Sequence, residues 1–393
     1  MTLNVSLGAG YDDNVLADSA GGGFTDPRRA QGGGFGSGSA QLTYGLNRRR
    51  VGLNASAGTS NRYYPNIAGD QVLAAQSGGL GAFIQIAKAT RIVASHTTSY
   101  QPYLTIGLFP QLFEVPGQVA PASQDLAVEE SDYFNHVSSI DLTQALTRKA
   151  SVSASYSRRS SDFQSADRDF KSNAAGGRFS LSFSRGLAMR LGYGYTDALY
   201  NVAGRGAVKA HNIDAGLDLN RPLSFSRRTT IAVSTGSTAI VDGDRTYYRL
   251  LANARLNREI GRTWNASLSY ARTAGFVESL AGPVFSDAVT LAYGGMVNRR
   301  FQFTSSLSAS IGEFALVGQG SGFDTYAASL GATYGLSRHM ALGVNYSHYR
   351  YAFDAGAPIE PGLSRELDRN SVQAYLSMWV PLVHQLRRPD ASR

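Results

Sequence analysis

The chain has 393 residues and a formal net charge of +8, but only 17% of its residues are charged, while it holds 43 Gly, 21 Tyr and 18 Phe. In a soluble chain about one quarter of the residues are usually charged. Here neutral polar residues take the place of the missing charged ones, which suits a sheet with one apolar face and one neutral-polar face. The absence of cysteine excludes a disulfide framework, a thiolate metal site and a cysteine nucleophile. No apolar run reaches the ~18 residues of a transmembrane helix.

Strand-like alternation begins at the second residue of the chain. Met1-Thr2-Leu3-Asn4-Val5 already alternates apolar and polar side chains, so no signal peptide opens the sequence. Because an exported protein needs such a signal, we expect a mature form from which the signal has been removed and to which a Met has been added.

Period-two alternation continues through the whole chain, in segments of roughly ten residues separated by turn residues, which is typical of a transmembrane β-barrel. Tyr326, Leu330 and Tyr334 fall on one face of such a segment, and Thr325, Ser329 and Thr333 fall on the other. The pattern predicts an all-β, antiparallel up-and-down barrel of about 18 strands (16 to 18). The predicted strands are 2–11, 34–46, 51–61, 77–87, 91–101, 133–146, 150–161, 174–184, 187–197, 210–220, 229–241, 246–258, 263–274, 286–297, 300–312, 323–336, 340–353 and 370–383.

Short and long connections alternate along this series. Because short turns face the periplasm in bacterial barrels, both termini are predicted to be periplasmic. Aromatic residues stand at strand ends on the apolar face, as expected for the belts at a membrane surface; they are Tyr44, Phe183, Tyr195, Trp264, Tyr270, Phe301 and Tyr346. We expect residues 1–383 to form a single outer-membrane barrel in contact with lipid and lipopolysaccharide.

Basic residues gather at the short turns, for example in Asn47-Arg48-Arg49-Arg50 and Asn298-Arg299-Arg300. A positive rim could gather an anionic solute or dock an acidic partner, whereas the simpler interpretation, which we favour, is pairing with lipid phosphates. The spread of these charges over many turns argues against nucleic acid.

An acidic stretch without Lys or Arg lies between Arg91 and Arg148. Most of its acids fall in the long loop predicted at 102–132, and a loop of this length is usually functional or disordered. This loop could fold into the lumen as a constriction, or bind divalent cations that bridge it to lipopolysaccharide. The alternative that we favour is a solvated surface loop. The candidate residues are Glu114, Asp125, Glu129, Glu130 and Asp132.

The opposite face of the strands is rich in Ser, Thr, Gly and Asn and is predicted to line the lumen. Such a wall exchanges hydrogen bonds with water or sugar hydroxyls without trapping an ion, and barrels of 16 to 18 strands leave an aqueous channel. A lumen filled by a loop or a partner is the alternative. The charged candidates on this face are Arg159, Arg178, Arg190, Asp214, Asp218, Arg249 and Arg255.

No catalytic or metal-binding pattern stands out, and no cofactor is expected. His136, Ser138 and Asp141 are the nearest approach to a triad, but on a strand the carboxylate points to the opposite face from the other two. Catalysis needs nucleophile, base and orienting group within reach, so we do not expect an enzyme.

The first strand ends in Gly10-Tyr11-Asp12-Asp13-Asn14-Val15. Asp and Asn favour turns by bonding their own backbone. An opening strand that closes in this motif, followed by a whole chain of hairpins, nevertheless resembles the β-barrel porin 2 family of outer-membrane barrels. Several members of that family are associated with exopolysaccharide export, so the resemblance implies a secretion pore for a polysaccharide, with no catalytic residues to transfer.

Residues 384–393 form a polar tail that is expected to be periplasmic. It replaces the terminal aromatic residue that ends many outer-membrane barrels, and it could contact a periplasmic export partner. Three functions follow from the sequence. The first is a channel for exopolysaccharide export, the second is a general small-solute porin, and the third is a plugged barrel that holds a periplasmic partner.

Overall fold

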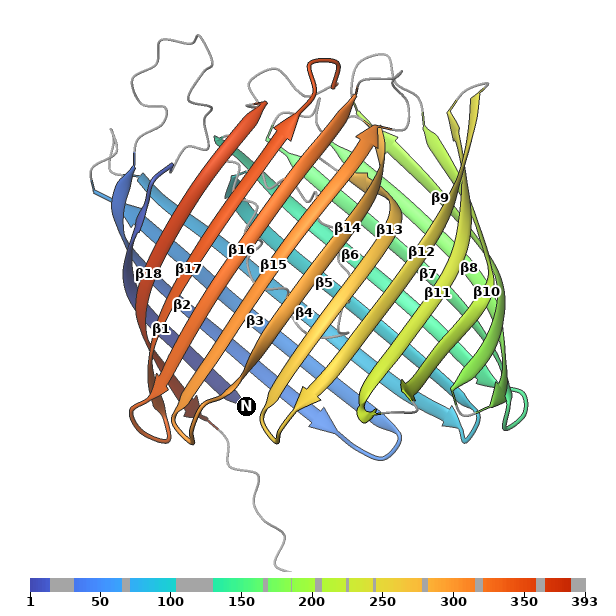
Figure 1. Cartoon of the computed structure of the whole chain (residues 1–393), viewed down its shortest axis with the longest axis horizontal. Helices are drawn as coiled ribbons and strands as arrows, with labels where there is room; N and C mark the ends of the chain where they lie inside the picture. The colour runs from blue at the N-terminus through green and yellow to red at the C-terminus, as the bar shows by residue number, and fades with distance from the viewer. Residues whose placement is uncertain are drawn as a thin grey trace, which may run out of the picture.

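The computed structural model describes residues 1–14, 32–65, 71–103, 130–164, 169–184, 186–201, 207–223, 226–242, 245–277, 282–314, 321–357 and 365–382. These residues form one closed, antiparallel, up-and-down barrel of 18 strands, in which β1 pairs with both β2 and β18 (Figure 1). The predicted fold class and strand number are confirmed. No helix in the described ranges is long and apolar enough to cross a membrane.

The first nine strands are β1 (Thr2–Asp12), β2 (Gly33–Asn47), β3 (Val51–Tyr64), β4 (Gln71–Ala87), β5 (Thr90–Tyr103), β6 (Glu130–Ala145), β7 (Ala150–Phe163), β8 (Phe170–Ser184) and β9 (Leu187–Tyr200). The second nine are β10 (Val208–Leu223), β11 (Ser226–Asp242), β12 (Arg245–Ile260), β13 (Trp264–Val277), β14 (Gly282–Met296), β15 (Phe301–Phe314), β16 (Gly322–Gly335), β17 (Met340–Phe353) and β18 (Glu366–Pro381).

The connections from each even-numbered strand to the next strand are short and lie at one end of the barrel, which we call the turn end (Figure 1). The long connections lie at the other end, the loop end, together with the two-residue connection between β11 and β12. The N-terminus lies at the turn end. Gly261 occupies the turn between β12 and β13 with a φ of 67°, a left-handed conformation that glycine adopts without steric cost. The connection between β10 and β11 is shorter than the predicted strands 210–220 and 229–241 imply, because β10 reaches Leu223 and β11 begins at Ser226.

The outer surface of the barrel is apolar over most of its height. Large side chains such as Leu7, Leu191 and Leu307 are more than half exposed and alternate with small polar residues along their strands. By the same alternation, the aromatic residues predicted at strand ends share this outer face. Closure of the sheet pairs the strand edges over the height of this apolar surface, which is the condition for crossing lipid.

The strands run further toward the loop end than the sequence predicts, because the alternation inverts there. On β8 the buried Phe170 faces inward while Lys171 faces outward, and on β18 the buried Leu367 lies between the outward Glu366 and Asp368. The buried hydrophobic residues therefore collect on the inner face at the loop end rather than in a central core; they include Phe35, Tyr64, Tyr133, Phe163, Phe170, Tyr200, Phe314, Phe323, Tyr351 and Phe353.

The last strand also differs from its predicted range of 370–383. β18 begins four residues earlier, at Glu366, and ends at Pro381. Residues 383–393, which contain the predicted tail, lie outside the described residues.

Candidate functional site

The inner wall of the barrel is the candidate functional site. Pairs across the ladder share a face, so the register places Ser153 of β7 beside Arg178 of β8, and Ser306 of β15 beside Ser329 of β16. Hydroxyl groups bond to one another across neighbouring strands, as between Ser6 and Ser39 (2.8 Å) and between Ser306 and Ser329 (2.7 Å). Between its charged residues, the wall thus consists largely of small, neutral, hydrogen-bonding groups.

The register turns the side chains of Arg159, Arg178 and Arg190 inward from three consecutive strands, β7 to β9. Arg190 pairs with Asp218 of β10, and its Nη2 also donates to the carbonyl oxygen of Thr235 at 2.5 Å. The Arg190 and Asp218 side chains are 12% and 38% exposed, so this ion pair lies mostly against the wall and only partly in the open lumen.

The second acidic candidate of this region, Asp214, lies on β10 where the ladder to β11 is irregular, between Ile213 and Leu219. Its side chain is outside the described set.

Arg255 and Arg249 both point inward from β12, but their surroundings differ. Arg255 donates from Nε to Asn257 Oδ1 at 3.0 Å on the open part of the wall. Arg249 lies near the loop end, where its Nη2 is 2.7 Å from Glu313 Oε1 of β15 and its guanidinium carbon is 5.0 Å from the centre of the Phe285 ring. Arg249 is therefore engaged in packing at the loop end, and Arg255 contributes to the wall through its bond to Asn257.

The charged side chains divide the lumen into two unlike halves. The strands β3 to β12 carry inward arginines, whereas among the described side chains of β13 to β18, β1 and β2 the register turns inward only the charges of Asp12 and Arg369, which pair with each other. One half of the wall is thus basic and the other neutral. The inward arginines are Arg62, Arg91, Arg159, Arg178, Arg190, Arg249 and Arg255.

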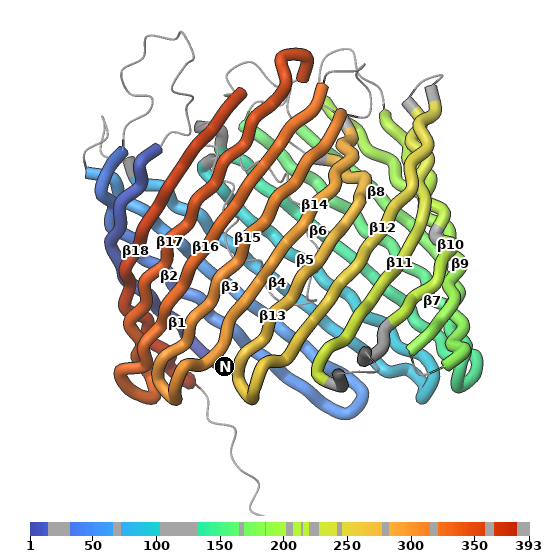
Figure 2. The backbone as a smooth tube through the Cα atoms, in the orientation of Figure 1, coloured from blue at the N-terminus to red at the C-terminus, as the bar shows by residue number. Residues whose placement is uncertain are grey.

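At the loop end, the sheet overlaps itself instead of continuing edge to edge. β12 and β13 pair only from Ile260–Trp264 up to Ala252–Arg272, and above this point β13 curves away from β12 (Figure 2). Phe285, on the outer face of β14, packs against the inward-facing Val208, Ala210 and Ile240 of β10 and β11.

Phe276 of β13 extends the same overlap. Its ring packs against this cluster and also against the cluster of Phe170, Ala198 and Tyr200 on β8 and β9. The upper parts of β13 to β15 therefore lie inside those of β8 to β12, as in a rolled sheet, and we call this arrangement the overlap.

The acidic candidates are not brought together within the described residues. Glu130 and Asp132 belong to β6 rather than to the predicted loop 102–132, because β6 begins at Glu130, three residues before the predicted strand 133–146. Glu114, Asp125 and Glu129 lie outside the described residues.

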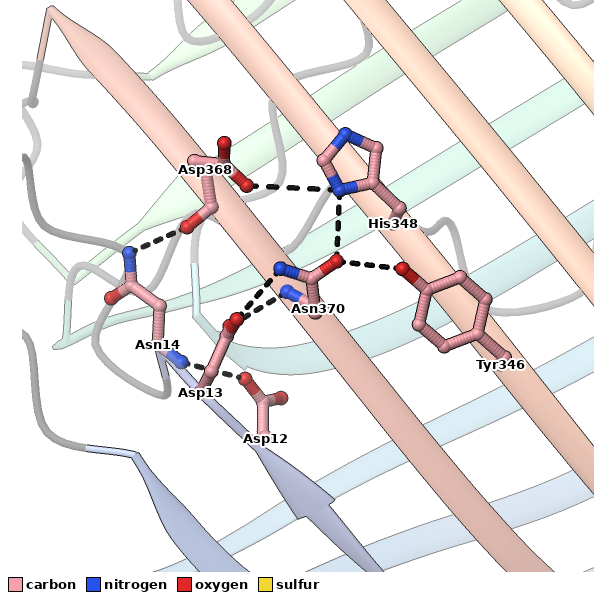
Figure 3. Close-up of polar contacts among 7 residues, drawn as sticks. All are labelled: Asp12, Asp13, Asn14, Tyr346, His348, Asp368 and Asn370. Atoms are coloured by element: carbon pink, nitrogen blue, oxygen red, sulfur yellow. Dashed lines mark hydrogen bonds and ion pairs between the residues drawn. The ribbon is translucent and has the colours of Figure 1, made fainter.

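The Gly10–Asn14 motif fastens the first strand to the last one at the loop end. Asp12 is completely buried, and its carboxylate accepts hydrogen bonds from Arg369 Nη2 at 2.5 Å and Arg369 Nε at 3.0 Å. Asp13 accepts from the backbone N and the Nδ2 of Asn370 at 2.6 and 2.7 Å, and Asn14 Nδ2 donates to the Asp368 carbonyl at 3.1 Å (Figure 3). We call this group of contacts the clasp.

Outward side chains of β17 complete the clasp. Tyr346 donates to Asn370 Oδ1 at 2.8 Å, and His348 Nδ1 lies 3.0 Å from the same oxygen (Figure 3). From the sequence alone the motif indicates a turn. Asp12 and Arg369 stand 357 positions apart, and only barrel closure makes them neighbours.

The cluster of His136 and Ser138 lies on the outer face, where Ser138 Oγ is 2.9 Å from His96 Nδ1 and the two imidazole rings stack at 6.1 Å. Asp141 faces the lumen, as expected, so no triad is formed. Within the described ranges, no group of three His, Asp or Glu side chains is arranged to hold a metal ion.

Fold and inner wall together define an 18-stranded antiparallel barrel with an apolar exterior and a polar interior. No family model matches the chain, and no curated protein matches it. Solved structures of similar shape include OpdQ of Pseudomonas aeruginosa, which is 12% identical, with 97% of each chain covered and a TM-score of 0.48. The FrpB iron transporter of Neisseria meningitidis is 10% identical over 95% of this chain and 66% of its own, with a TM-score of 0.48.

Proposed function

We propose that the chain is a bacterial outer-membrane pore for a hydrophilic solute, and that this solute is an exopolysaccharide leaving the cell. The observation that carries the proposal is the inner wall of neutral hydroxyl and amide groups inside a closed, apolar-coated barrel. Such a wall can exchange hydrogen bonds with sugar hydroxyls along its whole length. The resemblance of the Gly10–Asn14 motif to the β-barrel porin 2 family supports the same solute.

The proposal includes an orientation. The turn end and both termini face the periplasm, as short turns do in bacterial barrels, and the loop end faces the medium and the lipopolysaccharide. The basic turns at the periplasmic end would gather an anionic chain or hold a periplasmic export partner.

The test is single-channel conductance of the refolded protein in a planar bilayer, with alginate as the anionic polysaccharide added on one side. We expect a steady current that the polymer interrupts. A steady current that alginate leaves unchanged would instead support a general porin for small solutes.

A closed barrel that docks a partner is a second candidate, and the overlap is the observation that favours it. Protein shown to be folded, for example by its altered migration on a gel without heating, would then carry no current. The next step would be to look for a partner that is lost when residues 384–393 are deleted.

A further inference from the structure

Two aromatic side chains of β18, Tyr375 and Trp379, face the lumen in the half nearer the turn end. The register pairs Tyr375 with Gly8 and Gly343, and Trp379 with Asn4, all of which are inward-facing. They alternate with the outward Ala374, Leu376 and Met378, so neither belongs to the aromatic belts on the outer surface.

The Tyr375 ring lies flat against the inner wall. A methyl group built on Gly343 would come within 2.2 Å of the ring carbon Cζ, so the ring covers this glycine. The hydroxyl group reaches across β17 to lie 3.5 Å from Thr333 Oγ1 of β16. One face of the ring therefore contacts the wall, and the other is turned toward the lumen.

Trp379 lies one level nearer the turn end. Its indole stacks on the imidazole of His339, with ring centres 5.6 Å apart and planes 8° from parallel. Trp379 is 43% exposed, so nearly half of its surface is not covered by other side chains. Along a strand, positions four apart are separated by about 13 Å, so the two rings form successive platforms on the neutral half of the lumen.

Other aromatic rings that cover a glycine do not present a free face in this way. Phe83 also faces inward and covers Gly52, but the guanidinium carbon of Arg91 lies 4.6 Å from its ring centre and caps it. Trp264 covers Gly295 on the outer face of the barrel. The pair on β18 thus differs from rings that merely fill the space above a glycine.

We infer that Tyr375 and Trp379 form a stacking track for saccharide rings, an inference that rests on the proposed pore function and names a binding site within it. Sugar rings present a face of C–H groups that packs on an aromatic ring, while their hydroxyl edges bond to neighbouring polar groups. Such groups stand beside the track, with Asn345 and Gln373 inward on β17 and β18. A chain that moves along the wall would pass from one ring to the next.

The test measures blockade of single-channel current by cellohexaose and by a mannuronate oligomer of the same length. Tyr375→Ala and Trp379→Ala are each expected to shorten the blockades roughly 3- to 10-fold, the loss of one aromatic contact. Tyr375→Phe, which keeps the ring, should retain long blockades, and so should the matched controls Phe83→Leu and Trp264→Phe. Equal shortening with both oligomers would mean that stacking, rather than charge, holds the chain.

A second readout does not depend on current. The chain has two tryptophans, so in the Trp264→Phe variant the fluorescence arises from Trp379 alone, and cellohexaose should shift its emission. Normal conductance with blockades unchanged in both alanine variants would overturn the track and leave the pore in place. Folded protein that shows no conductance would overturn the proposed pore. If cellohexaose then also left the Trp379 emission unshifted, the saccharide-binding track would be overturned as well.

Discussion

Asp12 and Arg369 show how much a single contact contributes when it closes a barrel. The two side chains are 0% and 5% exposed and form a bidentate ion pair, the strongest geometry for a carboxylate and a guanidinium. Removal of one partner leaves a buried charge without compensation, which costs far more than the loss of an exposed pair. The Arg249–Glu313 pair, at 40% and 56% exposure, provides the comparison within the same molecule.

We therefore expect Asp12→Asn to lower the free energy of unfolding by about 3–5 kcal/mol, because the Arg369 guanidinium stays buried. Glu313→Gln should lower it by less than about 1 kcal/mol. The measurement is the temperature at which the folded barrel loses its altered migration on a detergent gel. Equal temperatures for the two variants would show that the clasp does not hold β1 to β18.

At the scale of the strands, the overlap is the feature that departs most from a regular barrel. β12 and β13 separate above Ala252 and Arg272, so the upper parts of both strands lack a ladder partner on that side. The buried Phe285 and the partly buried Phe276 pack there instead. Side-chain packing lacks the directional hydrogen bonds of a ladder, so we expect the overlap to open more readily than the paired strands do.

Phe276→Ala combined with Phe285→Ala should loosen the overlap, with a loss of about 3 kcal/mol or more from the buried Phe285 ring and a smaller loss from the partly buried Phe276 ring. We expect a higher mean conductance and more frequent fluctuations of the open channel. Phe163→Ala is the matched control, because this inward ring stacks on Tyr133 at the same end but outside the overlap. Fluctuations that rise equally in the control would assign the effect to general destabilisation.

Across the whole molecule, charge is distributed by face as well as by position. Arg158 and Arg159 are neighbours in sequence, but the register places Arg158 beside Ser138 on the outer face and Arg159 beside the inward Val137 and Ser172. A fixed charge acts on a permeating ion only within about a Debye length, which is about 10 Å in 0.1 M salt. Selectivity should therefore depend on the inward charges alone.

Arg159→Glu is expected to shift the reversal potential in a KCl gradient toward cation preference, and Arg255→Glu should act in the same direction. Arg158→Glu, which makes the same change on the outer face, should leave the potential where it is. An equal shift from Arg158→Glu would mean that the assignment of the two faces on β7 is inverted.

The alternation of side chains was sufficient to predict the fold, because a strand that separates lipid from water must repeat every two residues. It placed Tyr346 on the outer face and Arg178 on the inner one, as the register has them. It failed at the loop end, where Phe170 turns inward and Lys171 outward, because the strands there no longer face lipid and the pattern inverts. Tyr375 and Trp379 were open to the same reasoning, since they alternate with Leu376 and Met378.

By itself, then, the sequence determined the class of fold, the number of strands and the face on which most side chains lie, since all three follow from a local period. Only the tertiary structure decided which distant residues meet. The clasp joins positions 357 apart, and the overlap brings Phe276 onto Phe170 and Tyr200 from strands four and five places along the chain. Closure and overlap depend on how the whole sheet curves, and no local period carries that information.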